Sequence, residues 1–185
     1  MSDKKDEEKP GCLLARLRPS DAAKFCLEID KLIPDEDVNS AEGGKERDIH
    51  VSVLFGFNFG FEPEKLKKFL SKRNPFYFTL GAIGTFKNES VVLWVGVESP
   101  QIHDLHEALV EEFGDEIEET HPNYHPHLTL AYLKPGAKAA DLEGSTKFEG
   151  ETYYISELVF SYGTSAYRSA ETFKLGTVSE SVRSL

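Results

Sequence analysis

The stretch His50-Val51-Ser52-Val53-Leu54-Phe55 sets the pattern for this 185-residue chain, because a histidine and a hydroxyl residue alternate in it with two valines. In a β-strand, residues i and i+2 point to the same face, so the imidazole and the hydroxyl share one surface and the valines share the other. The stretch His127-Leu128-Thr129-Leu130-Ala131 repeats this arrangement. We therefore expect two half-buried strands whose aliphatic faces are covered by helices.

The polar faces of these two strands carry the residues for acid–base chemistry. If the strands lie side by side, one neutral imidazole can remove a proton, the other can donate one when protonated, and two hydroxyls can hold phosphate oxygens. Imidazole titrates near pH 6.5, so both protonation states are accessible close to neutrality. We expect His50, Ser52, His127 and Thr129 to be catalytic without a metal or another cofactor. The pattern leaves open which histidine is the base.

The composition is that of a compact soluble protein with one core. Hydrophobic residues make up 39% of the chain, and 21 basic against 32 acidic residues give a formal net charge of -11. Such a surface disfavours extensive binding to duplex DNA, whereas a small or short phosphate ligand in a locally positive pocket is allowed. Cys12 and Cys26 form no CxxC motif, which favours a reducing cytoplasm. We expect a monomer with no membrane partner, because no apolar run approaches the length of a membrane span.

Helical and strand patterns alternate along the chain. We expect a charged, disordered tail over 1–10, one domain over 11–177, and a mobile tail over 178–185. The predicted helices are Pro19 to about Lys31, Glu62–Arg73, and a segment after Ser99-Pro100. His103 and His106 flank the apolar stripe of this third helix and are expected in solvent. The predicted strands are Gly11–Leu17, Ile49–Phe55, Phe76–Phe86 and Ser90–Val97 joined by a hairpin at 87–89, His127–Leu133, Thr152–Tyr162 and Ala170–Leu175.

Both His-x-Ser/Thr pairs, together with Val92-Leu93-Trp94-Val95-Gly96-Val97 and the segment Leu158–Tyr162, resemble the two-histidine phosphoesterase superfamily over about residues 11–175. Bacterial RNA 2',3'-cyclic phosphodiesterases and phage-type enzymes that cleave cyclic oligonucleotide signals belong to it. The resemblance implies an α+β fold that is bilobal, with a pseudo-twofold pair of antiparallel sheets flanked by helices around a central groove. It also implies a metal-independent phosphodiesterase acting on a cyclic or 2'-linked nucleotide phosphodiester. Ser52 stands where threonine is commoner and keeps the hydroxyl.

Strand parity and nearby loops suggest residues that contact the substrate. Arg16 is a candidate for a phosphate contact, although an ordinary surface charge is the alternative. An aromatic ring could stack on a nucleobase for about 1–3 kcal/mol. For the tryptophan, packing is an equal alternative. The aromatic candidates are Trp94, Tyr77, Tyr124 and Phe61.

Other readings of the same sequence stay open. The groove could belong to a non-catalytic module that binds a nucleotide or RNA end as a sponge or sensor, or the acidic surface could dock a basic partner. Retention of both histidines favours catalysis, because binding alone does not need a matched acid and base. His121, His125 and His127 could suggest zinc, but two prolines interrupt the segment and His127 is already used by the paired motif. The sequence does not choose among RNA ends, 2',5' linkages and cyclic mono- or oligonucleotides.

Overall fold

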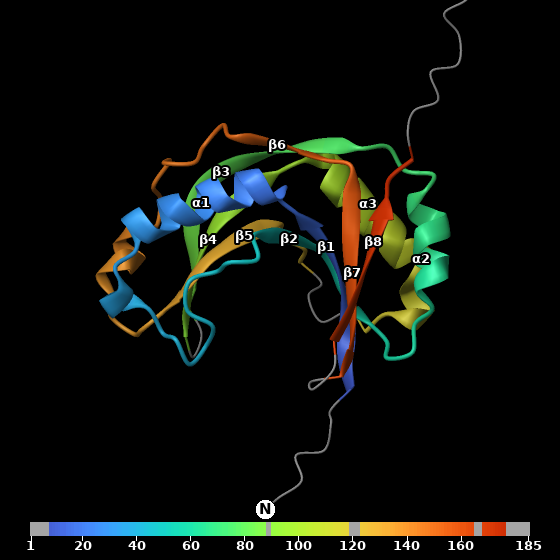
Figure 1. The fold of residues 1–185 in the computed structure, drawn as a ribbon, viewed down its shortest axis with the longest axis horizontal. Coiled ribbons are helices and arrows are strands. Elements are labelled where there is room, and N and C mark those ends of the chain that lie inside the picture. Colours follow the sequence, from blue (N-terminus) through green and yellow to red (C-terminus); the bar gives the residue numbers. More distant parts are fainter. Residues whose placement is uncertain (1–7, 88–89, 119–122, 165–167, 177–185) are drawn as a thin grey trace, which may run out of the picture.

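The computed structural model describes residues 8–87, 90–118, 123–164 and 168–176, and all structural statements concern these ranges. The described strands form one antiparallel sheet that curls into an arch, in the order β6-β3-β4-β5-β2-β1-β7-β8 (Figure 1). The strands are β1 (Glu8–Arg16), β2 (His50–Phe57), β3 (Phe76–Lys87), β4 (Val91–Glu98), β5 (His127–Leu133), β6 (Thr152–Ile155), β7 (Glu157–Thr164) and β8 (Arg168–Lys174). The α-helices are α1 (Pro19–Leu32), α2 (Pro63–Leu70) and α3 (Pro100–Phe113), with 3-10 turns η1 (Asp35–Asp37), η2 (Gly114–Glu116) and η3 (Lys138–Leu142).

The sheet divides into two lobes, each with its own helical cover (Figure 1). Lobe 1 contains β6, β3, β4 and β5, and α1 covers it through Phe25, whose ring lies 4.7 Å from that of Phe148. Lobe 2 contains β2, β1, β7 and β8, and it is covered by α2, which contacts β8, and by α3, which contacts β2. This arrangement confirms the predicted bilobal α+β fold, with the two predicted sheets joined edge to edge.

The helix-facing side of the sheet forms the core, as strand parity predicts. Val51, Val53, Leu128 and Leu130 have no exposed surface. His50, Ser52, His127 and Thr129, which alternate with them, are half-buried and lie on the opposite face. Burial of about 25 cal/mol per Å² of apolar surface therefore fixes which face the histidines occupy, because a slip of one residue would exchange the two faces.

The lobes join where β2 meets β5, at the single register position Val51 opposite Leu128. These two residues are 77 positions apart, as are the two histidines, so a local twofold relation between the antiparallel strands accounts for the spacing. Beyond this point each strand pairs with the segment that leads into the other. The N–H of Glu46 donates to Leu130 O at 2.9 Å, and the N–H of Glu118 donates to Gly56 O at 2.7 Å. The two strands therefore diverge on either side of the junction.

The largest differences from the sequence prediction concern three elements. The expected strand Thr152–Tyr162 is two strands separated by Ser156, and they lie in different lobes because β6 pairs with β3 and β7 with β1. β1 begins at Glu8, inside the predicted tail, and α2 ends at Leu70. Alternation of apolar residues shows that a segment is extended but does not identify its partner. The expected turn at 87–89 and the tail at 178–185 lie wholly or partly outside the described residues.

No helix in the described part of the chain is long and apolar enough to cross a membrane.

Candidate active site

β2 and β5 bring the four predicted catalytic residues together on the face of the sheet away from the helices. Val51 lies opposite Leu128 in an antiparallel pair, so His50 and Thr129 flank that position on one side, and Ser52 and His127 flank it on the other. Each imidazole therefore has the hydroxyl of the other strand as a neighbour, and the polar side chains alternate around one small area.

Both histidine rings are held by the carbonyl oxygen two residues earlier in the chain. Nδ1 of His50 bonds to Asp48 O at 2.5 Å, and Nδ1 of His127 bonds to His125 O at 2.7 Å. A carbonyl can only accept, so Nδ1 carries the proton in both rings. This fixes the tautomer and the ring orientation and assigns proton transfer to Nε2 in both cases.

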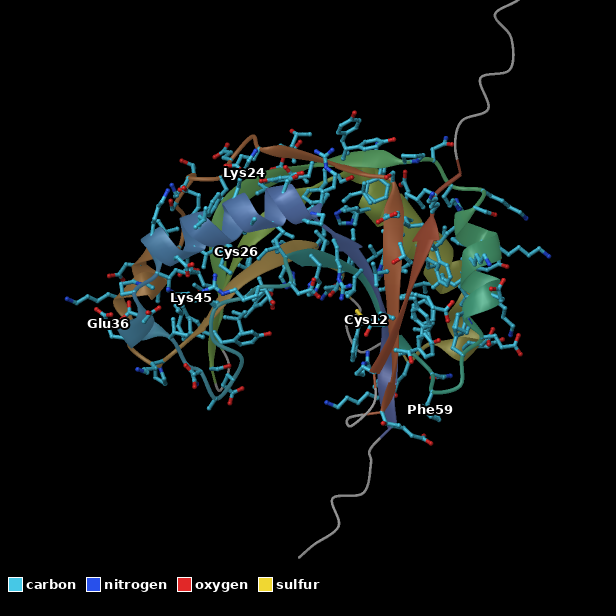
Figure 2. The ribbon with its side chains drawn as sticks, viewed as in Figure 1. Cys12, Lys24, Cys26, Glu36, Lys45 and Phe59 are labelled. Carbon is cyan, nitrogen blue, oxygen red and sulfur yellow. The ribbon has the colours of Figure 1, made fainter. Side chains whose placement is uncertain are left out.

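The hydroxyl of Ser52 has a donor behind it. The thiol of Cys12 on β1 donates to Ser52 Oγ at 3.8 Å, a weak contact (Figure 2 labels Cys12 on this strand). Burial raises the pKa of the Cys12 thiol to about 11, so the thiol stays protonated at neutral pH. Because Ser52 Oγ accepts from the thiol, its own hydrogen can point to a phosphate oxygen.

A cavity of about 480 Å³ opens between the lobes beside these residues. This volume lies within the range of small-molecule sites, roughly 300–1,000 Å³. Apolar and aromatic side chains make up most of the wall, and Ser52, His127 and Thr129 provide polar groups. His50 lies next to the cavity along β2, with its side chain 24% exposed. The remaining lining residues are Leu54, Phe55, Phe86, Val92, His106, Asn123, Tyr124, His125 and Tyr132.

Arg16 lies on the histidine face of the sheet, as strand parity predicts, and its contact with a phosphate stays a prediction. It is opposite His50 in the β1–β2 register, and its Nη2 is 2.8 Å from Asp48 Oδ2. Its Nε is buried and has no hydrogen-bond partner within the described ranges. The carbonyl of Asp48 orients His50 while its carboxylate holds Arg16, so one residue links the two side chains. The charge of Arg16 is thus partly balanced before any phosphate binds.

Trp94 lies on the histidine face, as predicted, but it is packed into the wall. It is opposite Thr129 in the β4–β5 register, and its ring centroid lies 5.0 Å from that of Phe86 and 5.9 Å from that of His127. The indole nitrogen is buried without a hydrogen-bond partner in the described part of the chain. This placement agrees with the packing alternative, and Phe86 presents the aromatic surface to the cavity instead.

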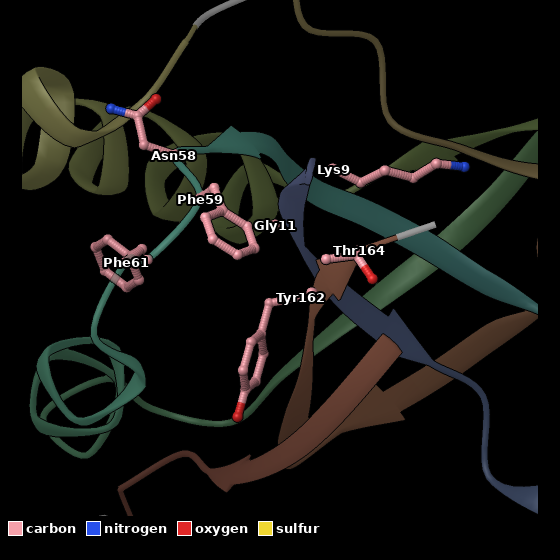
Figure 3. Close-up of a pocket in the computed structure, with 9 residues that line it drawn as sticks. Lys9, Gly11, Asn58, Phe59, Phe61, Tyr162 and Thr164 are labelled. Carbon is pink, nitrogen blue, oxygen red and sulfur yellow. The ribbon is translucent and has the colours of Figure 1, made fainter. Parts of the chain in front are cut away.

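The other three aromatic candidates differ in position. Tyr124 lines the cavity, whereas Phe61 and Tyr77 lie elsewhere and do not belong to this site. Phe61 is 7% exposed, packs 4.8 Å from Phe57, and borders a separate cavity of about 380 Å³ with Phe59 and Tyr162 (Figure 3). Its aromatic neighbours in the core of lobe 2 explain why it does not reach the groove.

Tyr77 has the predicted parity but the wrong position along its strand. It is 61% exposed near the start of β3, where its ring lies 4.9 Å from that of Tyr154. A β-bulge between Leu80 and Ile83 separates it from Phe86, the residue of β3 that lines the cavity. Parity assigns a face, whereas the distance along the strand decides whether a residue reaches the site.

Sequence reasoning missed His106, which was expected in solvent. Its side chain is buried, and Nδ1 lies 2.8 Å from Val53 O. The spacing of Ile102, His106 and Leu109 on α3 places the histidine within the apolar stripe rather than beside it. Phe86 and Tyr132 were also missed, because large apolar residues in strands are typical of a core.

Within the described residues, no group of three or more histidine, cysteine or acidic side chains is placed to hold a metal ion. His121, part of the zinc alternative, lies outside those residues. The expectation that the chemistry needs no metal stays a prediction.

Known proteins match this chain both in sequence and in structure. Residues 48–161, which contain both His-x-Ser/Thr pairs, match the family model described as the 2'-5' RNA ligase superfamily. No curated protein sequence matches the chain at a significant level. The solved structures give several matches, each covering over nine tenths of both chains.

One of them is TT0787 of Thermus thermophilus, with 20% identity and a TM-score of 0.63 over 91% of this chain and 99% of that one. Another is E. coli LigT complexed with 3'-AMP, with 19% identity and a TM-score of 0.60 over 91% and 96%. Usb1 of Kluyveromyces marxianus has 15% identity and a TM-score of 0.57 over 91% and 99%. At these identities the likeness establishes the fold.

Proposed function

The chain belongs to the 2'-5' RNA ligase superfamily, the two-histidine phosphoesterases that its sequence resembles, and from this premise we propose that it is a phosphodiesterase. Its substrate is a cyclic or 2'-linked nucleotide phosphodiester, such as a 2',3'-cyclic phosphate end or a small cyclic nucleotide. The observation that carries the proposal is the alternating set of His50, Thr129, Ser52 and His127 on adjacent strands, in which a carbonyl oxygen fixes the tautomer of each imidazole.

The reaction needs a base, an acid and donors for phosphate oxygens, and these residues supply all three. Nε2 of one histidine takes a proton from water, and the resulting hydroxide attacks phosphorus. Nε2 of the other histidine gives a proton to the ribose oxygen as its bond to phosphorus breaks. Ser52 and Thr129 donate to the non-bridging oxygens, where each well-aimed donor is typically worth about 10²-fold in rate. The product of a cyclic phosphate is a phosphomonoester, and both histidines return to their first states after one proton exchange.

The size and lining of the cavity favour a nucleotide of limited size as the ligand. Its volume of about 480 Å³ and the aromatic rings of Phe86 and Tyr132 suit a base and a sugar. LigT of E. coli has been solved in complex with 3'-AMP and with ATP, which makes nucleotides the first ligands to test. The net charge of -11 favours short substrates over long RNA.

The test is a cleavage screen with EDTA present throughout. The full chain is incubated with 2',3'-cyclic AMP, 2',5'-linked adenylate, cyclic dinucleotides and an RNA oligonucleotide ending in a cyclic phosphate, and the products are identified by mass spectrometry. His50→Ala and His127→Ala should each lose at least about 100-fold in kcat/KM, since general acid–base catalysis contributes roughly 10²–10⁴-fold. Lys24→Ala, which changes an exposed side chain of α1 outside the cavity wall, is the control.

Equal cleavage by the wild type and both histidine variants would refute the mechanism. Tight binding of one of these ligands without cleavage by the wild type would instead identify a nucleotide-binding module. Circular dichroism of each variant separates loss of a catalytic group from loss of the fold.

A further inference from the structure

Two side chains outside the His-x-Ser/Thr pairs hold the backbone of β2 next to Ser52. The hydroxyl of Tyr124 donates to Ser52 O at 2.9 Å, and Nδ1 of His106 donates to Val53 O at 2.8 Å. The two rings stack on each other with centroids 3.8 Å apart and planes 1° from parallel. A pair of side chains from two different segments therefore holds two consecutive carbonyl groups.

The backbone needs this support because the ladder is interrupted there. β2 pairs with β5 only at Val51, and the β1–β2 register shifts so that Leu13 lies opposite Leu54 and Leu14 opposite Ser52. Val53 is the extra residue of this β-bulge, a feature that redirects side chains at functional sites. On β5 the carbonyl related to that of Val53 by the local twofold is Leu130 O, and it accepts from the backbone N–H of Glu46. Side chains thus perform on β2 what the backbone performs on β5.

Both members of the pair are suited to act as permanent donors. His106 is only 9% exposed, and a carbonyl partner requires Nδ1 to carry the proton. Burial raises the pKa of the Tyr124 phenol, so its hydroxyl stays protonated and donates at neutral pH. Both residues also line the cavity. They hold the peptide group that directly follows Ser52 and the next one along β2, so the backbone on the C-terminal side of Ser52 is fixed.

We propose that His106 and Tyr124 are positioning residues for Ser52: the stacked pair fixes the peptide groups of the bulge and thereby directs the Ser52 hydroxyl at the phosphate. The part of this inference that concerns turnover rests on the proposed function. The part that concerns contact between Ser52 and a bound phosphate does not. Neither ring needs to touch the reacting atoms.

The test is a double-mutant cycle between Tyr124→Phe and Ser52→Ala. Phenylalanine keeps the ring and the stack and removes only the donated hydrogen bond. With Ser52 present, Tyr124→Phe should lower kcat/KM about fivefold and weaken binding of 3'-AMP, measured by calorimetry, by a similar factor, because a neutral hydrogen bond is worth about 1 kcal/mol. In the Ser52→Ala background the same change should have an effect of less than about twofold, since the group being positioned is gone.

Two further variants complete the design. Tyr153→Phe is the matched control, because it removes a tyrosine hydroxyl that bonds to Glu151 on the far side of lobe 1, away from the cavity. His106→Phe keeps an aromatic ring against Tyr124 and removes the donor to Val53 O, so it should repeat the non-additive result with Ser52→Ala. Thermal melts establish that each variant is folded at the assay temperature.

The outcomes are distinguishable. An equal loss in both Ser52 backgrounds, or no loss in either, overturns the positioning role. If the wild type cleaves none of the substrates, the proposed function fails, and the cycle in 3'-AMP affinity alone decides whether the pair positions Ser52. Non-additivity in that affinity supports the pair, and additivity overturns it.

Discussion

Gly84 on β3 gives a sharp test of how the wall beside His127 is built. A Cβ atom at this position would lie 2.8 Å from Cζ3 of Trp94 and closer still to Cζ2 and Cη2. Real Cβ contacts do not occur at such distances, so Gly84→Ala must displace the indole. The indole lies against Phe86 and near the ring of His127. The substitution therefore probes whether the stacked wall holds that histidine in place.

The size of the effect follows from two opposing contributions. Overpacking costs about 1–3 kcal/mol. Replacing glycine by alanine returns about 0.4–1 kcal/mol, because the unfolded chain loses conformational freedom. Gly84→Ala should therefore lower the free energy of unfolding by about 1–2 kcal/mol, or the melting temperature by roughly 3–6 °C for a domain of this size. A shift of the wall by about 1 Å can reduce kcat/KM by about 10- to 100-fold.

Gly96→Ala on the neighbouring strand is the matched control. Its Cβ would lie 3.6 Å from Ala82 O and 3.7 Å from Cζ3 of Trp94, which are ordinary contacts. Trp94 is the single tryptophan of the chain, so its fluorescence reports directly on the wall. The emission spectrum should change in Gly84→Ala and stay close to wild type in Gly96→Ala. Unchanged emission and an unchanged melting temperature in Gly84→Ala would refute the packing described for Trp94.

Three further predictions concern protons. The pH profile of kcat/KM should be bell-shaped, and His50→Asn and His127→Asn should each remove a different limb of it. The variant that loses the fall in activity at low pH identifies the base. Retention of both limbs in either variant would contradict a catalytic role for the histidine that it replaces. Hydrogen bonds from Lys31 and Lys147 lower the pKa of Glu28 from 4.5 to about 2, so this carboxylate stabilises the fold above pH 4.5 and the effect is lost as pH falls through 2. Glu28→Gln should accordingly melt below the wild type at pH 7, with the gap narrowing below pH 4.5 and closing near 2; a gap independent of pH would count against the ion pairs. The Cys26→Ser variant leaves Cys12 as the single cysteine. Iodoacetamide at pH 7.5 should label the Cys12 thiol about 100-fold more slowly than an ordinary thiol, because the pKa of Cys12 is about 11 rather than 9.0. Fast labelling would contradict the burial that raises this pKa.

The face of each central strand could be predicted from the sequence because burial depends only on local alternation. His50, Ser52, His127 and Thr129 alternate with aliphatic residues that are fully buried in the structure. The pairing of strands could not be predicted in the same way. Ser156 separates two strands that lie in different lobes, and nothing in their alternation of residues distinguishes one partner strand from another.

The same limit explains which site residues were found. Arg16 and Trp94 lie beside the histidines because parity and register act together over a few residues. Tyr77 has the correct face but lies beyond a bulge, and Phe61 is drawn into an aromatic core. His106 depends on a contact between α3 and β2, which is set by packing of distant segments. Sequence periodicity alone therefore does not predict residues whose place in the site depends on tertiary contacts.

The one-residue connection between β6 and β7 limits how far the halves of the arch can separate. Ile155 is paired in lobe 1 and Glu157 in lobe 2, with only Ser156 between them. Two peptide units span at most about 7 Å, so the chain acts as a short tether across that rim. Any movement of one lobe relative to the other therefore has to keep these two strand ends within that distance.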